Sequence, residues 1–310
     1  MKKIVIISFA IVSLVACTNK DEQLRQRATE LCQYVPDHEL LEQSKGFLTE
    51  DFYSVLDTMF NHLPDEEPLE HEWIYYFVTG NGGTIADYTV TAVEQTDSKH
   101  AVATVSVRQT WEDGEVEENC EPETHYLYME KVGGQWLMSD FDEHKQDCIR
   151  HIANHRKEQA MRDVMGDYLI NEIGSQYRQG DLCIPVQMIV AEEEQDNGQV
   201  LVWGDFWVFW YQMDGDTLKT ISGGNHSGCM TLVRHEGALT VSAFDQTVDG
   251  AGNMASAQRI FGNHFDIFQS MHSNPEIMEV NRQMQLRNYL ERHNIIAHYY
   301  QDYGWPVVKL

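Results

Sequence analysis

The stretch GQWLMSDFD, residues 134–142, is the most informative in the chain, because a related stretch, GALTVSAFD, occupies residues 237–245. The Asp-Gly pair at 113–114 is likewise matched by an Asp-Gly pair at 214–215. The offsets between matched positions lie between 100 and 103 residues. A shared order of features at a nearly constant offset indicates an internal repeat of about one hundred residues.

Each copy of the repeat is expected to be a helix followed by an antiparallel meander. In the first copy, Phe47, Phe52, Val55, Leu56 and Met59 recur at helical spacing. Alternating segments separated by short turns follow, as hairpins require. The strands of this copy are expected at residues 85–96, 99–111, 123–132 and 135–141.

The second copy repeats this order and then continues into further helices. Its first helix is expected over residues 161–173, where apolar side chains again recur at helical spacing. Its strands are expected at residues 185–195, 199–213, 217–222, 229–235 and 238–245. Two more helices are expected near residues 254–272 and 276–293. The tail over residues 295–300 is interpreted as a last strand or a docking segment.

These elements predict an α+β protein with two tandem domains, each a helix packed on a curled antiparallel sheet, and with extra C-terminal helices. At roughly 100–200 residues per domain, the chain length also suggests two domains. The expected division is a leader (1–16), a lipidated tether with a first helix (17–40), a first domain (41–150) and a second domain (151–310).

The segment FLTEDFY, residues 47–53, followed later by residues 134–141, resembles exported domains of unknown function in the cystatin-like, nuclear-transport-factor-2-like superfamily. The resemblance covers residues 40–150 closely and 155–250 loosely. It implies a cone-shaped fold in which Trp136 and Phe141 are core and sheet-end residues. The superfamily contains isomerases, dehydratases and many non-catalytic binding modules, so the fold alone does not select a function.

The N-terminus predicts export and lipidation. A short basic start, Met1 to Lys3, precedes an apolar run that is too short to cross a membrane but has the length of a secretory signal. Leu-Val-Ala-Cys at residues 14–17 resembles a bacterial lipobox, in which the thiol of Cys17 is lipidated and becomes the new N-terminus. The alternative is an ordinary signal peptide that happens to contain Cys17.

The residues after Cys17 bear on location. Position 18 is Thr rather than Asp, which favours the bacterial outer membrane under the usual lipoprotein sorting rule. Lys20, Asp21 and Glu22 resemble the acidic tether signal of surface-exposed lipoproteins, although a solvated tether is an equal alternative. We therefore expect a lipid-anchored protein of the outer membrane, either surface-exposed or facing the periplasm.

Charge and composition exclude several partners. The chain carries 22 Lys and Arg against 49 Asp and Glu, a formal net charge of −27, and loss of Lys2 and Lys3 with the leader makes this −29. Nucleic-acid binding and electrostatic docking on anionic lipid both require a basic surface, so neither is expected. A hydrophobic content of 42% excludes global disorder.

Five cysteines remain after Cys17, and export places them in an oxidising compartment. Five thiols allow at most two disulfides, and the sequence does not determine their connectivity. No CxxC motif occurs, so neither a redox motif nor a zinc knuckle is supported. The alternative is that they are small buried thiols. The residues concerned are Cys32, Cys120, Cys148, Cys183 and Cys229.

The densest aromatic patch lies on the expected strand over residues 202–211. Both faces of this strand are apolar, as expected for a central strand buried on both sides. One face carries Trp203, Asp205, Trp207 and Tyr211, which form the candidate ligand-binding set for a sugar or an apolar ligand. Core packing is the favoured alternative.

Three further groups of residues invite a chemical interpretation. His144, Cys148, His151 and His155 share one face of a helix and suggest a metal, but a core stripe containing Cys148 competes with that interpretation. The Gly-rich segment 222–229 contains Ser, His and Cys yet lacks a nucleophile elbow, and is interpreted as an inter-strand loop. Residues 245–253 lack EF-hand spacing and are interpreted as an acidic loop.

No catalytic residue, metal ligand or cofactor is therefore predicted. The expected function is that of a non-catalytic module that binds a small molecule, a glycan or a protein while anchored through Cys17. The first alternative is an isomerase or hydrolase-like enzyme with its site inside one cone. The second is a structural component of a cell-envelope assembly.

Overall fold

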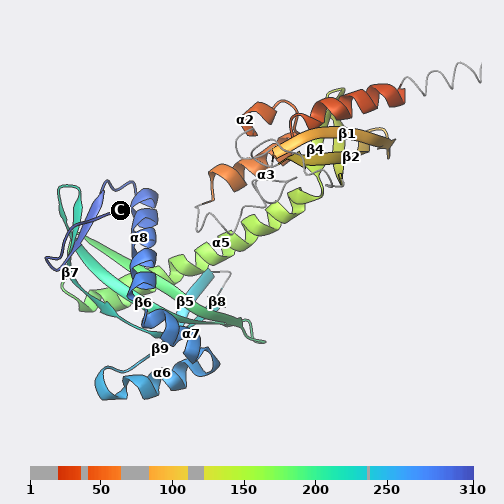
Figure 1. Ribbon diagram of the computed structural model, residues 1–310. Coiled ribbons are helices and arrows are strands. Elements are labelled where there is room, and N and C mark those ends of the chain that lie inside the picture. Colours follow the sequence, from red (N-terminus) through yellow and green to blue (C-terminus); the bar gives the residue numbers. More distant parts are fainter. Residues whose placement is uncertain (1–19, 36–40, 64–83, 111–121, 236–237) are drawn as a thin grey trace, which may run out of the picture. The chain divides into compact units, whose positions relative to one another are not determined.

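The computed structural model describes residues 20–35, 41–63, 84–110, 122–235 and 238–310. The predictions for the leader, for Cys17 and for Cys120 lie outside these residues. The chain separates into two compact units, with the boundary between His155 and Arg156. Both units combine helices with a sheet, so the predicted α+β class is confirmed (Figure 1).

The first unit contains a four-stranded antiparallel sheet with strand order β1-β2-β3-β4. Its strands are β1 (Thr84–Gln95), β2 (His100–Thr110), β3 (Glu123–Val132) and β4 (Gln135–Phe141), close to the predicted ranges. The helices are a segment over residues 20–32, α2 (Leu41–Ser44) and α3 (Glu50–Asn61).

The core of the first unit forms between helices and sheet. Glu50 and Asp51 place negative charge in the first turn of α3, where the helix dipole favours it. Phe52, Leu56 and Met59 then recur on the buried face of α3. Alternate residues of β2 are almost fully buried, as expected for a strand with one face on the core. These residues are Ala101, Ala103, Val105 and Val107.

The second unit contains a seven-stranded mixed sheet, preceded by a long helix. Helix α5 (His144–Tyr168) crosses the boundary between the units and continues as a π-helical turn, Leu169–Ile173. The strands that follow are β5 (Leu182–Glu194), β6 (Val200–Asp214), β7 (Thr217–Asn225), β8 (Gly228–His235) and β9 (Ala238–Gln246).

The C-terminal part adds α6 (Asn253–Phe261), α7 (Phe265–His272) and α8 (Pro275–Arg292). Helix α8 begins with Asn274, whose side chain accepts two backbone N–H bonds, and with a proline in its first turn. The tail then forms β10 (Tyr299–Asp302), which pairs in parallel with β7, and β11 (Val308–Lys309). Of the tail segment 295–300, only residues 299–300 are strand, so the interpretation as a last strand holds for the end of that segment alone.

Strand β6 is the centre of this sheet. It pairs with β5 on one side and with both β7 and β8 on the other. Trp207 lies opposite Asn225 and Gly204 lies opposite Gly228, so β7 and β8 keep one register against β6. They are in effect one strand interrupted at residues 226–227. Beyond the interruption the sheet divides, because β9 pairs with β8 and β10 pairs with β7.

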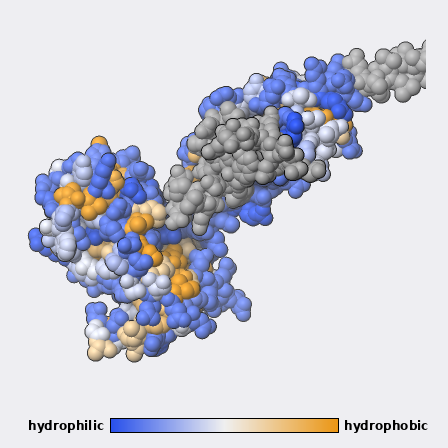
Figure 2. Space-filling model, viewed as in Figure 1, coloured by the Kyte–Doolittle hydropathy of each residue, from blue (hydrophilic) through white to orange (hydrophobic). Residues whose placement is uncertain are grey.

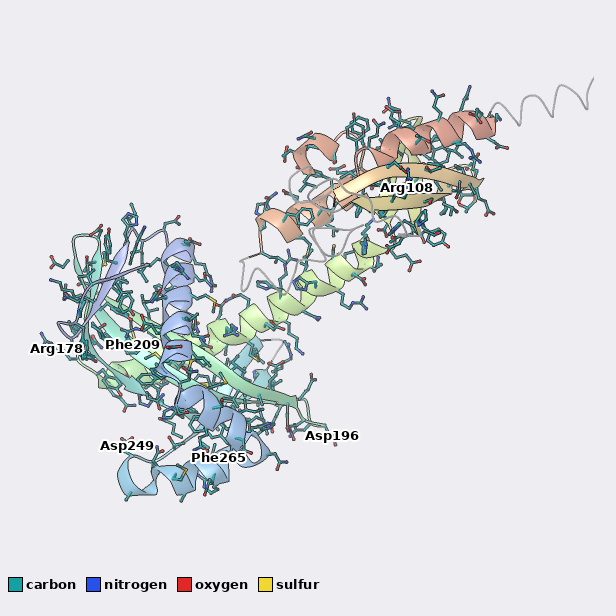
Figure 3. The ribbon with its side chains drawn as sticks, viewed as in Figure 1. Arg108, Arg178, Asp196, Phe209, Asp249 and Phe265 are labelled. Atoms are coloured by element: carbon teal, nitrogen blue, oxygen red, sulfur yellow. The ribbon has the colours of Figure 1, made fainter. Side chains whose placement is uncertain are left out.

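Both faces of β6 are buried, as the sequence predicts for a central strand. One face carries Val202, Phe206 and Val208, which pack with Met165 and Leu169 from α5 and the π-helical turn. The other face packs under the C-terminal helices. There the core includes Phe209 and Tyr211 from β6 with Leu286 and Leu290 from α8. Figure 3 shows Phe209 where α8 crosses the strands.

The four described cysteines, Cys32, Cys148, Cys183 and Cys229, are free thiols. Burial raises the pKa of Cys32, Cys148 and Cys183 to about 12 and that of Cys229 to about 11. Cys32, Cys148 and Cys183 match the interpretation as small buried thiols, whereas Cys229 is half-buried. Among the described residues, no helix is both long and apolar enough to cross a membrane.

Candidate functional site

The candidate ligand face of β6 lies beneath α6, α7 and α8. The indole N–H of Trp203 donates to the carbonyl of Ile260 at 2.8 Å, and its ring lies 4.7 Å from that of His264. The ring of Trp207 stacks on Phe209 at 5.7 Å, and its indole N–H is buried without a hydrogen-bond partner among the described residues. The structure thus places the two tryptophans along one covered face.

Asp205 forms the polar centre of this face and is only 1% exposed. One carboxylate oxygen accepts hydrogen bonds from the Asn225 amide and from the Ser227 hydroxyl, the latter at 2.6 Å. The other oxygen lies 2.9 Å from Nδ1 of His272, the last residue of α7. Asn225 and Ser227 flank the interruption between β7 and β8, so Asp205 fixes that interruption and also holds α7.

The imidazole of His272 links this buried carboxylate to the surface, because its side chain is 42% exposed. Its ring stacks on Phe268 at 5.1 Å, one helical turn earlier. The bond from Nδ1 to Asp205 leaves Nε2 on the other side of the ring, where no described residue is recorded as its hydrogen-bond partner. The arrangement is a fixed, half-exposed imidazole above a buried carboxylate.

Asp205 and His272 each favour the charged form of the other. Burial opposes ionisation of Asp205, yet hydrogen bonds from His272, Ser227 and Asn225 hold the pKa of its carboxyl below the usual range. The hydrogen bond to Asp205 raises the pKa of His272, against a smaller effect of desolvation. The C-terminal end of α7 also favours a positive imidazole. We conclude that the pair is an ion pair when His272 is protonated.

This pair predicts a definite pH dependence of stability. The raised pKa of His272 contributes stability that is complete below its unfolded pKa of about 6.5 and is lost as pH rises through the folded value. The lowered pKa of Asp205 contributes stability above about pH 3.9 that is lost as pH falls. Urea unfolding between about pH 6 and about pH 9 should therefore show a decline that His272→Gln removes.

The exposed His235, at the end of β8, provides the control for this experiment. His235→Gln should leave the decline between pH 6 and pH 9 in place. An unchanged decline in His272→Gln would show that another group causes it.

Tyr211, the last residue of the candidate set, is fully buried under Arg282 of α8. The guanidinium of Arg282 donates to the Tyr211 hydroxyl at 3.1 Å and to the Thr220 hydroxyl at 2.9 Å, and pairs with Asp302 at 3.1 Å. It also lies 3.9 Å from the centroid of Phe209, within cation–π range. Tyr211 therefore belongs to a closed polar core that joins α8, β6, β7 and β10.

The pKa shifts of Arg282 and Tyr211 agree with a closed polar core. Burial works against its charge, but the contacts with Tyr211 and Asp302 raise the pKa of its guanidinium overall. Burial likewise raises the pKa of Tyr211 to about 12. Both groups keep their ordinary protonation states at neutral pH. This part of the face is thus filled by the side chains of the protein.

The segment over residues 222–229 consists mostly of strand, with the link 226–227 between β7 and β8. His226 and Ser227 face different partners. The ring of His226 bonds the Tyr177 hydroxyl at 2.9 Å and the Gln246 side chain at 2.9 Å, whereas Ser227 bonds Asp205. The nucleophile–base contact that covalent catalysis requires is not formed between these two residues.

The remaining constellations do not form a metal centre in the described part of the chain. No group of three or more His, Cys, Asp or Glu side chains is arranged there to hold a metal ion. On α5, Cys148 and His155 are buried and Cys148 belongs to the core of the first unit. In the acidic segment 245–253, Asp245 pairs with Arg259 through two hydrogen bonds.

Asp205 was recognisable from the sequence, but its hydrogen-bond partners were not. A buried carboxylate requires hydrogen-bond donors. The sequence therefore predicts that Asp205, in a strand expected to be buried, has such donors. The donors themselves, Asn225, Ser227 and His272, come from segments 20 to 67 residues away. Arg282 was missed because its helix carries several other charged residues at similar spacing.

No model of a protein family matches the chain, and no curated protein matches it. A weak structural match exists to a chain described as "Ntf2 like protein involved in plasmid conjugation". It has 9% sequence identity and covers 74% of this chain and 98% of that chain, with a TM-score of 0.21. At this score the likeness carries no argument about function.

Proposed function

We propose that the chain is a bacterial outer-membrane lipoprotein, anchored through Cys17, whose second unit is a non-catalytic binding module. It faces either the periplasm or the cell exterior, and its ligand is a small molecule, a glycan or a protein. The lipobox at residues 14–17 supports the anchor. The net charge of −27 is unfavourable for nucleic acid as a ligand.

The observation that carries the binding function is the Asp205–His272 pair. Side chains from four segments hold it in place through hydrogen bonds, and polar groups that are already in place bind ligands with little loss of conformational entropy. His272 presents an imidazole at the surface, and the aromatic side chains Trp203 and Trp207 lie on the same face of β6 as Asp205. This combination of a fixed polar group and half-buried aromatic side chains suits a sugar or a polar aromatic ligand.

A thermal-shift screen of glycans, peptides and lipids on residues 21–310 tests this function. A ligand of the site should raise the melting temperature of the protein, and Trp203→Ala and Trp207→Ala should each abolish that shift. Trp305→Ala is the matched control, because Trp305 is 72% exposed on the C-terminal segment. A shift that survives both β6 variants and is lost in Trp305→Ala would place the ligand elsewhere.

The Asp205–His272 pair also favours a second candidate, an isomerase or hydrolase-like enzyme. A carboxylate that orients an imidazole leaves Nε2 free to act as a general base on a substrate or a water molecule. In that case His272→Ala would abolish turnover, whereas the binding module shows no turnover in either protein. A panel of ester, glycoside and isomerase substrates, assayed with both proteins, separates the two functions.

A third candidate, a structural component of an envelope assembly, is favoured by exposed apolar side chains near the C-terminus. Ile296, Tyr303, Trp305 and Val307 are each more than half exposed. Figure 2 shows hydrophobic surface over this part of the second unit. Under this candidate, light scattering of the purified protein would show an assembly that Trp305→Ala disperses.

We also infer that both units are cystatin-like cones arranged in tandem. The support is topological. If β7 and β8 are counted as one strand, the order β5-β6-β7/β8-β9 has the connectivity of β1-β2-β3-β4. An experimental structure in which each sheet curls around its helix would agree with this inference, and two flat sheets would contradict it.

A further inference from the structure

The helix over residues 20–32 is part of the folded core of the first unit. Its inner face carries Leu24, Ala28, Leu31 and Cys32, each at most 6% exposed. These positions recur at the spacing of one helical face. Burial of such apolar side chains stabilises the packing of the helix against the sheet. The helix is therefore not a free extension of the chain.

Two arginines fasten the same helix to both edges of the sheet. Arg25 donates to the carbonyls of Val90, at 3.0 Å, and Thr91, at 3.3 Å, on edge strand β1. Arg27 donates through Nε to the carbonyl of Trp136, at 2.8 Å, on the other edge strand, β4. The helix is fixed in position as well as buried.

The covalent distance from the expected lipid to this helix is short. Only residues 18 and 19 separate Cys17 from Lys20. Three residue steps span at most about 11 Å when fully extended. The headgroup layer on one side of a bilayer is itself roughly 5–8 Å thick. A protein lipidated at Cys17 thus has almost no spacer beyond the headgroups.

We propose that the first unit lies directly against the lipid headgroups, with the start of helix 20–32 as its point of contact. This rests on the proposed lipidation of Cys17. The contact is imposed by the short connection rather than by charge, since exposed Lys20 is followed by exposed Asp21 and Glu22. The protein would therefore bind its ligand while its first unit remains at the membrane surface.

Fluorescence quenching measures this contact. The acylated full-length protein, carrying a dye at Glu22→Cys, is placed in phosphatidylcholine vesicles in which a minor fraction of lipids bears a headgroup nitroxide. A second protein carries the dye at Asn61→Cys, at the end of α3, which lies far from the start of helix 20–32 (Figure 1). Both carry Cys120→Ser. Of the described native thiols, Cys32, Cys148 and Cys183 are buried and Cys229 is half-buried, and all four have a raised pKa, so they react slowly with the dye.

The dye at position 22 should be strongly quenched and the dye at position 61 should not. Insertion of twelve Gly/Ser residues between Asn19 and Lys20 adds a flexible spacer of about 20 Å and should reduce quenching at position 22 at least about threefold. Quenching should persist at high salt, where charge contacts are screened. Equal quenching at position 22 with and without the insertion would overturn the proposal.

A second measurement separates this inference from the anchor on which it rests. Amide hydrogen exchange of the full chain in detergent should show residues 20–32 protected like the core of the first unit. Free exchange there overturns the inference even when Cys17 is acylated. Intact mass of the same sample reports acylation, and an unacylated Cys17 means that the anchor itself is wrong.

Discussion

Replacing Arg282 with alanine is expected to lower the free energy of unfolding of the second unit by about 3–5 kcal/mol. Arg282 is 2% exposed and donates to Tyr211, Thr220 and Asp302. Its removal leaves two buried hydroxyls without their donor and leaves Asp302 without its counter-charge. It also empties the space beside Phe209, so cavity and electrostatic effects add.

Urea unfolding followed by circular dichroism measures this effect on residues 21–310. Arg287→Ala is the matched control, because Arg287 lies on the same helix and is exposed, and its effect should stay within about 0.5 kcal/mol. Arg282→Met should cost less than Arg282→Ala, since the methionine refills part of the space. Equal small effects in all three proteins would contradict the closed core described for this face.

Replacing Asp205 with alanine is expected to cost about 2–4 kcal/mol, because three donors lose a shared buried acceptor. The Asn225 amide N–H then loses its carboxylate acceptor, the Ser227 hydroxyl keeps only its hydrogen bond to Asn225 Oδ1 at 2.8 Å, and His272 loses its anchor on β6. Asp205→Asn should restore only part of this, since one carboxylate oxygen is replaced by an NH2 group that must face a donor, either protonated His272 or the Asn225 and Ser227 side. The free energy of unfolding from urea titration at pH 6 measures the difference.

Hydrogen exchange distinguishes this local account from general loss of stability. In Asp205→Ala, amides of α7 should exchange faster than those of α5, because α7 is held to the sheet through His272. Asp196→Ala, in the exposed β5–β6 turn, is the control and should change neither region. A uniform increase across the second unit would show that Asp205 has no special role in holding α7.

The sequence predicted the strands well because their signals are local. The range 199–213 expected for β6 differs by one residue at each end from the observed Val200–Asp214, since alternation and the Asp-Gly turn mark its limits. The burial of both faces of β6 also followed from its composition. The sequence left two interpretations of residues 295–300, a last strand or a docking segment, because so short an apolar run shows no clear periodicity.

The candidate site was predicted only in part because its geometry depends on contacts between distant segments. Asp205 and the two tryptophans were visible on one strand, but the helices that cover them begin about fifty residues later. Helical spacing was seen on both sides of residue 156, yet the single continuous helix α5 was not predicted. Its exposed polar residues carry no periodic signal that joins the two parts.

Intact-mass analysis of the full-length protein, expressed with its own leader in a Gram-negative host, tests the proposed anchor most directly. The mass should correspond to a chain that begins at Cys17 and carries acyl groups, and Cys17→Ser should remain unprocessed and unacylated. A mature chain that begins at any other residue, or an unmodified Cys17, would contradict the lipoprotein assignment and with it the membrane contact of the first unit.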